Sequence, residues 1–221
     1  MKIISFSLWG TNPVYCIGAI KNVELAHILY PGWMCRFYCG KNTDKTCINE
    51  LKSFDNSEVV EMEESGDWSS MFWRFFAADS DSTVISRDTD SRLNEREKAA
   101  VDEWLDSTYD FHIMRDHPLH RNIILGGMWG ARNGILKGIT TNIKEYHTST
   151  DFINDYGVDQ NFLKDHIYPR VKETSKIHDP FFEGLPFPSP RIGRQFVGQP
   201  FAIDDTELDL SHGDMIIQFG K

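Results

Sequence analysis

The first part of the chain alternates between short apolar runs and segments with helical spacing. Three runs rich in apolar residues are typical of strands, and apolar residues recur every three or four positions in the two segments between them. The strands are predicted at residues 3–9, 33–39 and 58–62, and the helices at residues 14–29 and 45–54. Because strands that alternate with helices in this way form a parallel sheet covered by helices, we predict an α/β fold.

The second part of the chain continues the pattern less regularly. We predict helices at residues 67–78, at residues 94–105 and from residue 156 on, and strands at residues 83–86 and 111–114. Asn94 and Glu97 form a capping box for the second of these helices, and the first has an aromatic face with Arg74 off that face. From residue 177 on we expect loops that wrap the surface or close over a site. A chain of 221 residues that is 40% hydrophobic can bury one core, so we predict a single domain, residues 1–221.

Two aspartates follow directly after the fourth predicted strand. In an extended backbone alternate side chains share a face, so Asp88 and Asp90 point the same way. Two adjacent carboxylates repel each other unless a cation lies between them, and Mg²⁺ or Mn²⁺ suits such oxygen ligands. Ligands of open α/β sheets bind beyond the carboxyl ends of the strands, where this pair falls. The pair is therefore a candidate metal site, with a solvated acidic turn as the alternative.

A second pair with the same spacing lies on the other side of that strand. Asp79 and Asp81 precede the strand, so we expect them at the opposite edge of the sheet, in a polar turn. We expect no metal there.

Charge and cysteine content limit the partners and the compartment. The formal net charge of −10 argues against broad binding to nucleic acid or anionic membranes, and an anionic substrate would need a local cation. The sequence has neither an apolar run near 18 residues nor a signal-like leader, so we predict no transmembrane segment and a cytoplasmic protein. The four cysteines lack zinc-site spacing and are expected to be reduced; they are Cys16, Cys35, Cys39 and Cys47.

Clustered glycines mark a further candidate region. Gly126, Gly127 and Gly130 surround Trp129, a pattern typical either of close backbone approach to a ligand or of a hairpin turn. Downstream, Asp159 lies at the start of a predicted helix, where an acidic residue is also common for structural reasons.

These motifs together resemble the GT-A nucleotide-sugar glycosyltransferases, in particular the small single-domain members of bacteria and large DNA viruses. In that family an Asp-x-Asp (DxD) motif holds a divalent metal against the donor diphosphate. The resembling segments are residues 6–10, 87–92, 114–118, 126–130, 157–163, 177–179 and 196–199. The resemblance implies a GT-A (Rossmann-like) fold with a mixed, mostly parallel sheet flanked by helices. It also implies a nucleotide-binding half, residues 1–92, and an acceptor- and sugar-binding half, residues 93–221.

The resemblance also assigns the donor-binding residues. Asp88 and Asp90 would hold the metal, with Asp88 also near the ribose. His178 matches a third metal ligand, against the alternative of a surface histidine. Arg74 and Arg87 would neutralise phosphate or brace the aspartates, or else pair with acidic neighbours. The nucleoside would lie against Ser7, Leu8, Trp9 and Gly10, with Gly127 of the glycine cluster also at the donor.

On the sugar side, the resemblance assigns Asp159 and Gln160 to the transferred sugar. Asp159 would be the catalytic base or would accept a hydrogen bond from a sugar hydroxyl, and Asp116 is the rival for this role. A bound divalent cation stabilises the charge that grows on the departing diphosphate, while a carboxylate near the sugar can accept the proton of an acceptor hydroxyl.

The resulting hypothesis is a metal-dependent hexosyltransferase. It would use Mn²⁺ or Mg²⁺, a nucleoside diphosphate sugar with UDP as the favoured nucleotide, and a carbohydrate acceptor, in the cytoplasm or, for a viral chain, the host cytoplasm. One alternative is a non-catalytic nucleotide- or carbohydrate-binding module. Another is a sugar-nucleotide nucleotidyltransferase, which is disfavoured because the loop at residues 9–13 contains no Lys or Arg.

Overall fold

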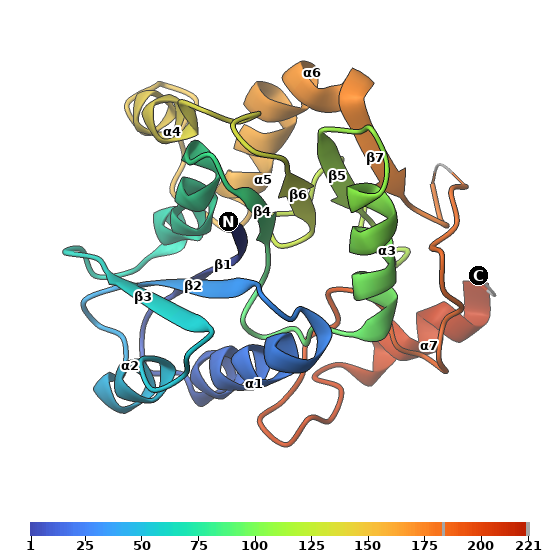
Figure 1. Cartoon of the computed structure of the whole chain (residues 1–221), viewed down its shortest axis with the longest axis horizontal. Coiled ribbons are helices and arrows are strands. Elements are labelled where there is room, and N and C mark those ends of the chain that lie inside the picture. The colour runs from blue at the N-terminus through green and yellow to red at the C-terminus, as the bar shows by residue number, and fades with distance from the viewer. Residues whose placement is uncertain (183, 220–221) are drawn as a thin grey trace.

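One mixed sheet of seven strands runs through the protein in the computed structural model, which describes residues 1–182 and 184–219 (Figure 1). The strands are β1 (Lys2–Leu8), β2 (Met34–Cys39), β3 (Ser57–Glu61), β4 (Thr83–Ser86), β5 (Phe111–Met114), β6 (Trp129–Ala131) and β7 (Ser175–His178). Their order in the sheet is β3-β2-β1-β4-β6-β5-β7. β6 is antiparallel to its neighbours β4 and β5, and the other adjacent pairs are parallel.

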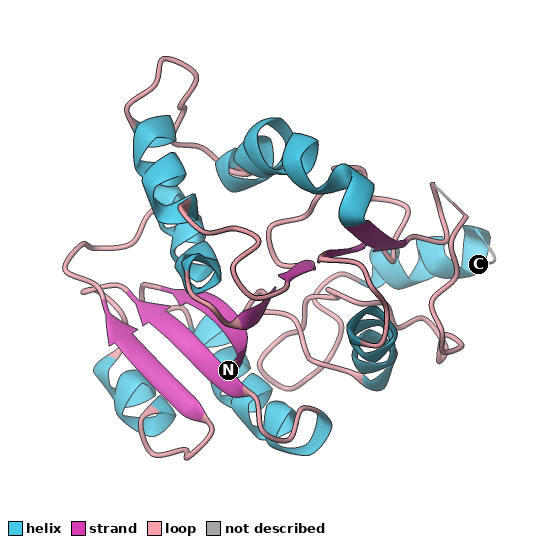
Figure 2. Cartoon of the chain, turned by 45° about the horizontal axis from the view of Figure 1, so that its top comes forward, coloured by secondary structure: helices cyan, strands magenta, loops and turns pink. Residues whose placement is uncertain are grey.

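Helices cover both faces of this sheet (Figure 2). One face packs against α1 (Pro13–Leu29), α2 (Lys45–Leu51) and α3 (Glu95–Leu105). The other packs against the 3-10 helix η1 (Trp68–Asp79), α4 (Ile139–His147) and α5 (Val158–Phe162), which runs on through η2 (Leu163–Ile167), α6 (Tyr168–Val171) and η3 (Lys172–Thr174). The last helix is α7 (Leu210–Phe219). This is a single α/β domain, as the sequence predicts.

Local sequence explains where the first helices begin. The Asn12 side chain accepts a hydrogen bond from the Val14 amide, and Pro13 occupies the first turn of α1, where its missing N–H costs nothing. Asp44 caps α2 in the same way, accepting hydrogen bonds from the amides of Thr46 and Cys47. These caps satisfy amides that have no partner inside a helix.

The two sides of β1 belong to two hydrophobic cores. Six of its seven residues are buried, because β1 lies between β2 and β4 with helices on both faces. Phe6 stacks on Phe37 of β2 in the core beneath α1, with ring centroids 4.7 Å apart. Ile3 faces the opposite core, beneath η1 and α4. Burial on both faces makes β1 the rigid element from which the site is built.

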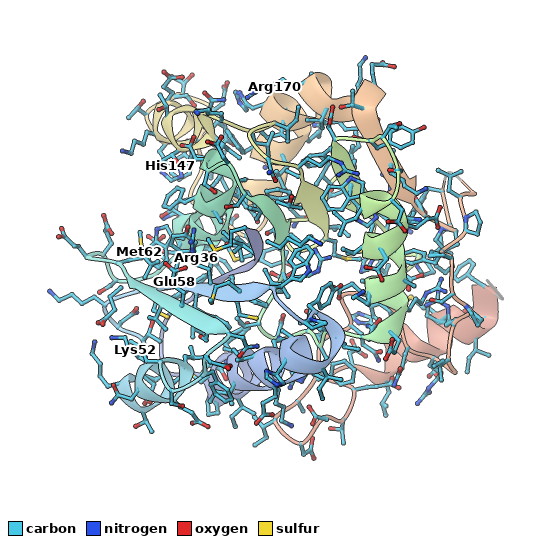
Figure 3. The ribbon with its side chains drawn as sticks, viewed as in Figure 1. Arg36, Lys52, Glu58, Met62, His147 and Arg170 are labelled. Carbon is cyan, nitrogen blue, oxygen red and sulfur yellow. The ribbon has the colours of Figure 1, made fainter. Side chains whose placement is uncertain are left out.

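The outer strand β3 carries charged side chains. Figure 3 shows Arg36 on β2 close to Glu58 on β3, where the two residues are register partners and form a 2.8 Å ion pair. Lys52, directly after α2, contacts Glu61 at the end of the same strand, at 2.6 Å. Charges on an edge strand discourage pairing with another chain. Across residues 1–182 and 184–219, no helix combines the length and apolar character needed to cross a bilayer.

The structure corrects several expectations for individual elements. The capping box is only half formed: Asn94 accepts from the Glu97 amide, but the Glu97 side chain turns inward to an ion pair. Arg74, expected off the buried face of its helix, is 2% exposed. The region from residue 177 on is not all loop, since β7 ends at His178 and α7 lies near the end of the chain. The helix α4 was also missed, and its N-terminal amides bond to the distant Asp79 carboxylate.

Candidate functional site

A cleft of about 570 Å³ opens at the carboxyl ends of β1 and β4. Segments that are far apart in the sequence line it. They are the end of β1 (Ser7, Leu8 and Trp9), the turn after β4 (Asp88, Thr89 and Asp90), the loop before β6 (Leu125, Gly126 and Met128), the region around α5 (Tyr156 and Gln160) and the C-terminal part (Gly198 and Pro200). The cleft therefore lies where ligands of open α/β sheets bind.

Asp88 and Asp90 both line this cleft. They do so from a turn rather than from an extended strand, because Thr89 and Asp90 form a turn after β4 ends at Ser86. Burial, and then the charge of Asp88, raise the pKa of Asp90 to about 6. The Asp88 carboxylate is thus close enough to oppose the ionisation of Asp90.

The C-terminal part of the chain fixes the backbone of this turn. The Phe201 amide donates to the Asp90 carbonyl at 2.9 Å, and Ser91 forms a β-bridge with Pro200. Arg92 binds the Asp205 carboxylate at 2.9 Å and donates to the Ala202 carbonyl at 3.3 Å. The expectation that the tail closes over the site agrees with these contacts.

Arg74 connects the acidic turn to a third carboxylate. Its guanidinium forms ion pairs with Asp88 and, at 2.7 Å, with Asp159 of α5. Burial raises the pKa of Asp159, although the positive charge of Arg74 opposes the shift. One buried cation thus holds the acidic turn and α5 in a fixed relation, which is the bracing position that the sequence suggests for Arg74.

Two glycines let the backbone approach these carboxylates closely. A Cβ atom at Gly127 would lie 2.0 Å from Asp88 Oδ2, and one at Gly126 would lie 2.2 Å from Asp159 Oδ2 and 2.3 Å from Arg74 Nη2. At Gly126 and Gly127 the backbone therefore approaches side chains of the site closely, whereas approach to a bound ligand stays a prediction. Gly130 instead forms part of β6 and meets Trp104 in the core.

The acidic pair could hold a hard divalent cation. Among the described residues no Lys or Arg forms an ion pair with Asp90; the charges of Arg74 and Arg92 act on its carboxylate without an ion pair, while the charge of Asp88 opposes its ionisation. The described residues contain no group of three or more His, Cys, Asp or Glu side chains that could hold a metal alone. Mg²⁺ is commonly held by one or two carboxylates together with substrate phosphates, and this donor set fits that mode.

Three residues predicted for the site lie elsewhere. His178 ends β7, and its ring bonds to His112 at 2.8 Å, so it does not join the acidic pair. Arg87 is buried against Glu97 of α3, at 2.6 Å, and is not part of the cleft lining. Both oxygens of Asp116 bond to Arg96, and further bonds come from Arg191 and the Val197 amide. These contacts make Arg87 and Asp116 parts of the buried framework.

The remaining predicted residues are close to the cleft. Gln160 lines it and accepts a hydrogen bond from Asn122 at 2.7 Å. The Ser7 hydroxyl, also in the lining, accepts from the Arg74 amide at 2.9 Å. Gly10 is the turn residue beyond Trp9, with a φ of 72° and an amide that donates to Asn42.

The cleft also contains side chains that the sequence did not indicate. Tyr15, Trp68, His120 and Tyr156 all contribute to its lining. Burial lowers the pKa of His120 to about 3. Tyr15, Trp68 and Tyr156 stand out as large aromatic side chains that remain exposed. The exposure of a side chain is visible only in the folded structure, so the sequence alone could not mark them.

Comparisons with known proteins support the fold. No protein-family model and no curated protein matches the sequence. A glycosyltransferase involved in the glycosylation of the major capsid of PBCV-1 aligns with 81% of this chain and 81% of its own, with 14% identity and a TM-score of 0.53. The mannosyltransferase PcManGT from Pyrobaculum calidifontis, solved with GDP-Man and Mn²⁺, aligns with 83% of this chain and 55% of its own, with 13% identity and a TM-score of 0.54. At such low identity the likeness shows the fold alone, and this fold is the GT-A fold. The predicted fold class is confirmed.

Proposed function

We propose that this protein is a metal-dependent glycosyltransferase that moves a hexose from a nucleoside diphosphate sugar, with UDP as the favoured nucleotide, to a hydroxyl of a glycan acceptor. One observation carries the proposal: Asp88, Asp90 and Arg74 line a single cleft of a GT-A sheet, and Arg74 also binds the separate carboxylate Asp159, which is buried next to this lining. Two carboxylate groups in different environments suit the two tasks of glycosyl transfer, which are to hold the leaving group and to act on the sugar side.

In this proposal the acidic pair binds the donor diphosphate through Mn²⁺ or Mg²⁺. Asp88 and Asp90 would hold this cation, which would supply Lewis-acid stabilisation of the departing diphosphate. Ser7, Leu8 and Trp9 line the same cleft and would receive the nucleoside, in keeping with the proposed nucleotide-binding half, residues 1–92. Arg74 fixes the direction of the Asp88 carboxylate, so the ligand is preorganised before the donor arrives.

On the sugar side, Asp159 is the proposed base or hydroxyl acceptor. The bond between the anomeric carbon and the diphosphate oxygen breaks with its electron pair going to the diphosphate, and the acceptor oxygen forms the new bond to that carbon. The acceptor's proton leaves to a carboxylate or to solvent. Burial raises the pKa of Asp159, which makes it a better proton acceptor than an ordinary aspartate. Asp116 bonds to Arg96, Arg191 and the Val197 amide rather than to Arg74 of the cleft lining, so it has no part in this scheme.

The compartment of the reaction is proposed to be the cytoplasm. The structure contains four buried free cysteines, which suit a reducing environment.

The proposal is tested by product analysis with UDP-glucose, UDP-galactose and GDP-mannose in Mn²⁺. We expect free nucleoside diphosphate to appear, slowly with water and faster with a carbohydrate acceptor. Asp88→Ala and Asp90→Ala should abolish turnover in a folded protein. Release of pyrophosphate in a nucleotidyl transfer assay would favour a nucleotidyltransferase, and nucleotide binding without any turnover would favour a binding module. Either result would contradict the proposal.

A further inference from the structure

Two exposed aromatic side chains form part of the cleft lining. Trp68 at the start of η1 is 45% exposed, and Tyr156 just before α5 is 73% exposed. Their ring centroids are 5.5 Å apart at an interplanar angle of 86°, so the edge of one ring meets the face of the other. We call this pair the aromatic ridge. Large apolar surfaces left open beside a cleft commonly mark a binding site.

Hydrogen bonds hold the aromatic ridge together. The Asp67 carboxylate accepts from the Ser69 amide at 2.8 Å, which fixes the first turn of η1. The same carboxylate accepts from Asn154 at 3.0 Å, two residues before Tyr156. This contact ties the loop before η1 to the loop before α5, so the two rings are presented together.

The ridge lies on the sugar side of the proposed reaction. Tyr156 precedes Gly157, where the chain turns with a φ of 81° into α5, the helix that carries Asp159 and Gln160. Burial, and then the charges of Asp88 and Asp159, raise the pKa of the Tyr156 hydroxyl, in keeping with its position beside these carboxylates. A molecule resting on the ridge would therefore lie beside the N-terminal end of α5, which the proposed reaction assigns to the sugar.

The chemistry of the ridge selects the kind of molecule. A pyranose ring presents one face of C–H bonds, which pack favourably against the negative face of an aromatic ring. Acidic residues occur close to both rings in the sequence, at Glu63, Glu64, Asp67, Asp151 and Asp155. Their charge disfavours an anionic ligand such as a sugar phosphate.

We propose that the aromatic ridge is the acceptor subsite and that it stacks a neutral pyranose ring of the acceptor. This inference rests on the proposed glycosyltransferase function and adds to it the residues that bind the acceptor and the neutral character of the bound ring. Binding there positions the acceptor next to Gln160 at the start of α5, the helix that carries the buried Asp159, while donor binding depends on other residues of the cleft.

The inference is tested with Trp68→Ala and Tyr156→Ala, with Trp68→Phe as the conservative variant. Tyr109→Ala is the matched control, since Tyr109 is 43% exposed and comes from the segment before β5. Three quantities are measured for each protein: hydrolysis of the UDP-hexose without acceptor, UDP affinity in Mn²⁺, and KM for lactose, maltose and cellobiose. Saturation-transfer NMR with the same disaccharides reports their binding without turnover.

We expect both alanine variants to raise the KM of the preferred disaccharide by about tenfold or more. Donor hydrolysis should change by less than about twofold, because water can attack the donor without stacking on the ridge. UDP affinity should change equally little, because donor binding depends on other residues of the cleft. Trp68→Phe should keep most of the acceptor affinity, and Tyr109→Ala should behave as the wild type.

Several results would overturn the inference. An unchanged acceptor KM and NMR signal in both alanine variants would remove the ridge from acceptor binding. A parallel loss of UDP affinity would identify it as a surface for the nucleobase. A preference for glucose 6-phosphate over glucose as acceptor would contradict the neutral class. If the wild type neither hydrolyses nor transfers any donor, the proposed function itself fails, which is a different result from an active enzyme with inert variants.

Discussion

Gly127 offers a single-methyl test of the acidic turn. An alanine Cβ at this position would lie 2.0 Å from Asp88 Oδ2, whereas ordinary van der Waals contact begins at 3.4 Å. The Asp88 carboxylate must therefore move by about 1.4 Å, and its backbone amide, 2.9 Å from the new atom, limits how it can do so. The φ of Gly127 is not in the left-handed region, so alanine adds no backbone strain of its own.

This displacement should reduce activity far more than stability. A shift of about 1 Å in a positioned group can cost on the order of 100-fold in rate, so we expect kcat/KM of Gly127→Ala to fall by about 100-fold. The Asp88 side chain is 38% exposed and can move toward the cleft, so the melting temperature should fall little. Release of UDP from a saturating UDP-hexose measures the first effect, and scanning calorimetry measures the second.

Gly130→Ala provides the matched control three residues away. There the methyl group would meet Trp104 at 2.9 Å and Ile85 at 3.1 Å, inside the core and away from the carboxylates. Overpacking of this kind costs about 1–3 kcal/mol of stability, and kcat/KM of the folded enzyme should stay near the wild-type value. Wild-type activity in Gly127→Ala, or an equal loss of activity in both variants while both are folded, would refute the reasoning.

Three further predictions concern other buried groups. Glu97→Gln leaves the buried Arg87 without its anion, and urea unfolding should show a loss of about 3–5 kcal/mol; a loss below about 1 kcal/mol would argue against the pair. Burial, and then a nearby His178 charge, hold the pKa of His112 well below its ordinary value. Stability should therefore be complete above about pH 6.5 and fall as the pH drops through that unfolded-state value, by up to about 1.4 kcal/mol per pH unit; His112→Phe should flatten this slope, and an unchanged slope would exclude His112 as its source. Asp159→Asn should lower kcat by about 10²–10⁴-fold at unchanged UDP affinity in Mn²⁺, and calorimetry that finds equally weakened UDP binding would contradict its place on the sugar side.

Much of the first half of the fold follows from local patterns. The first four strands and the helices between them each carry their own periodicity, and Asn12 and Asp44 supply caps that the sequence displays. The second half depends more on distant contacts. β7 is four residues long and is defined by its pairing with β5. The amide at the start of α4 donates a hydrogen bond to the distant Asp79 carboxylate. The local sequence of β7 and α4 does not reveal these distant partners.

The candidate site shows the same division. The sequence predicts the position of Asp88 and Asp90 at the cleft, because their spacing and their place after a strand are local features. Arg87 does not lie at the site as predicted. The alternation of side chains along an extended backbone already places Arg87 and Asp88 on opposite faces, and Arg87 pairs with Glu97 of α3. His178 was misplaced because the strand order was unknown. β6 and β5 lie between β4 and β7, and three strand spacings are about 14 Å.

Calorimetric titration of UDP into the protein, with Mn²⁺ and then with EDTA, tests most directly whether the acidic turn binds a donor diphosphate through a cation. Binding should be strong with Mn²⁺, weak or absent with EDTA, and insensitive to Mn²⁺ in Asp90→Asn. Equal UDP affinity in Mn²⁺ and in EDTA, or a full Mn²⁺ effect in Asp90→Asn, would contradict the proposed role of Asp88 and Asp90.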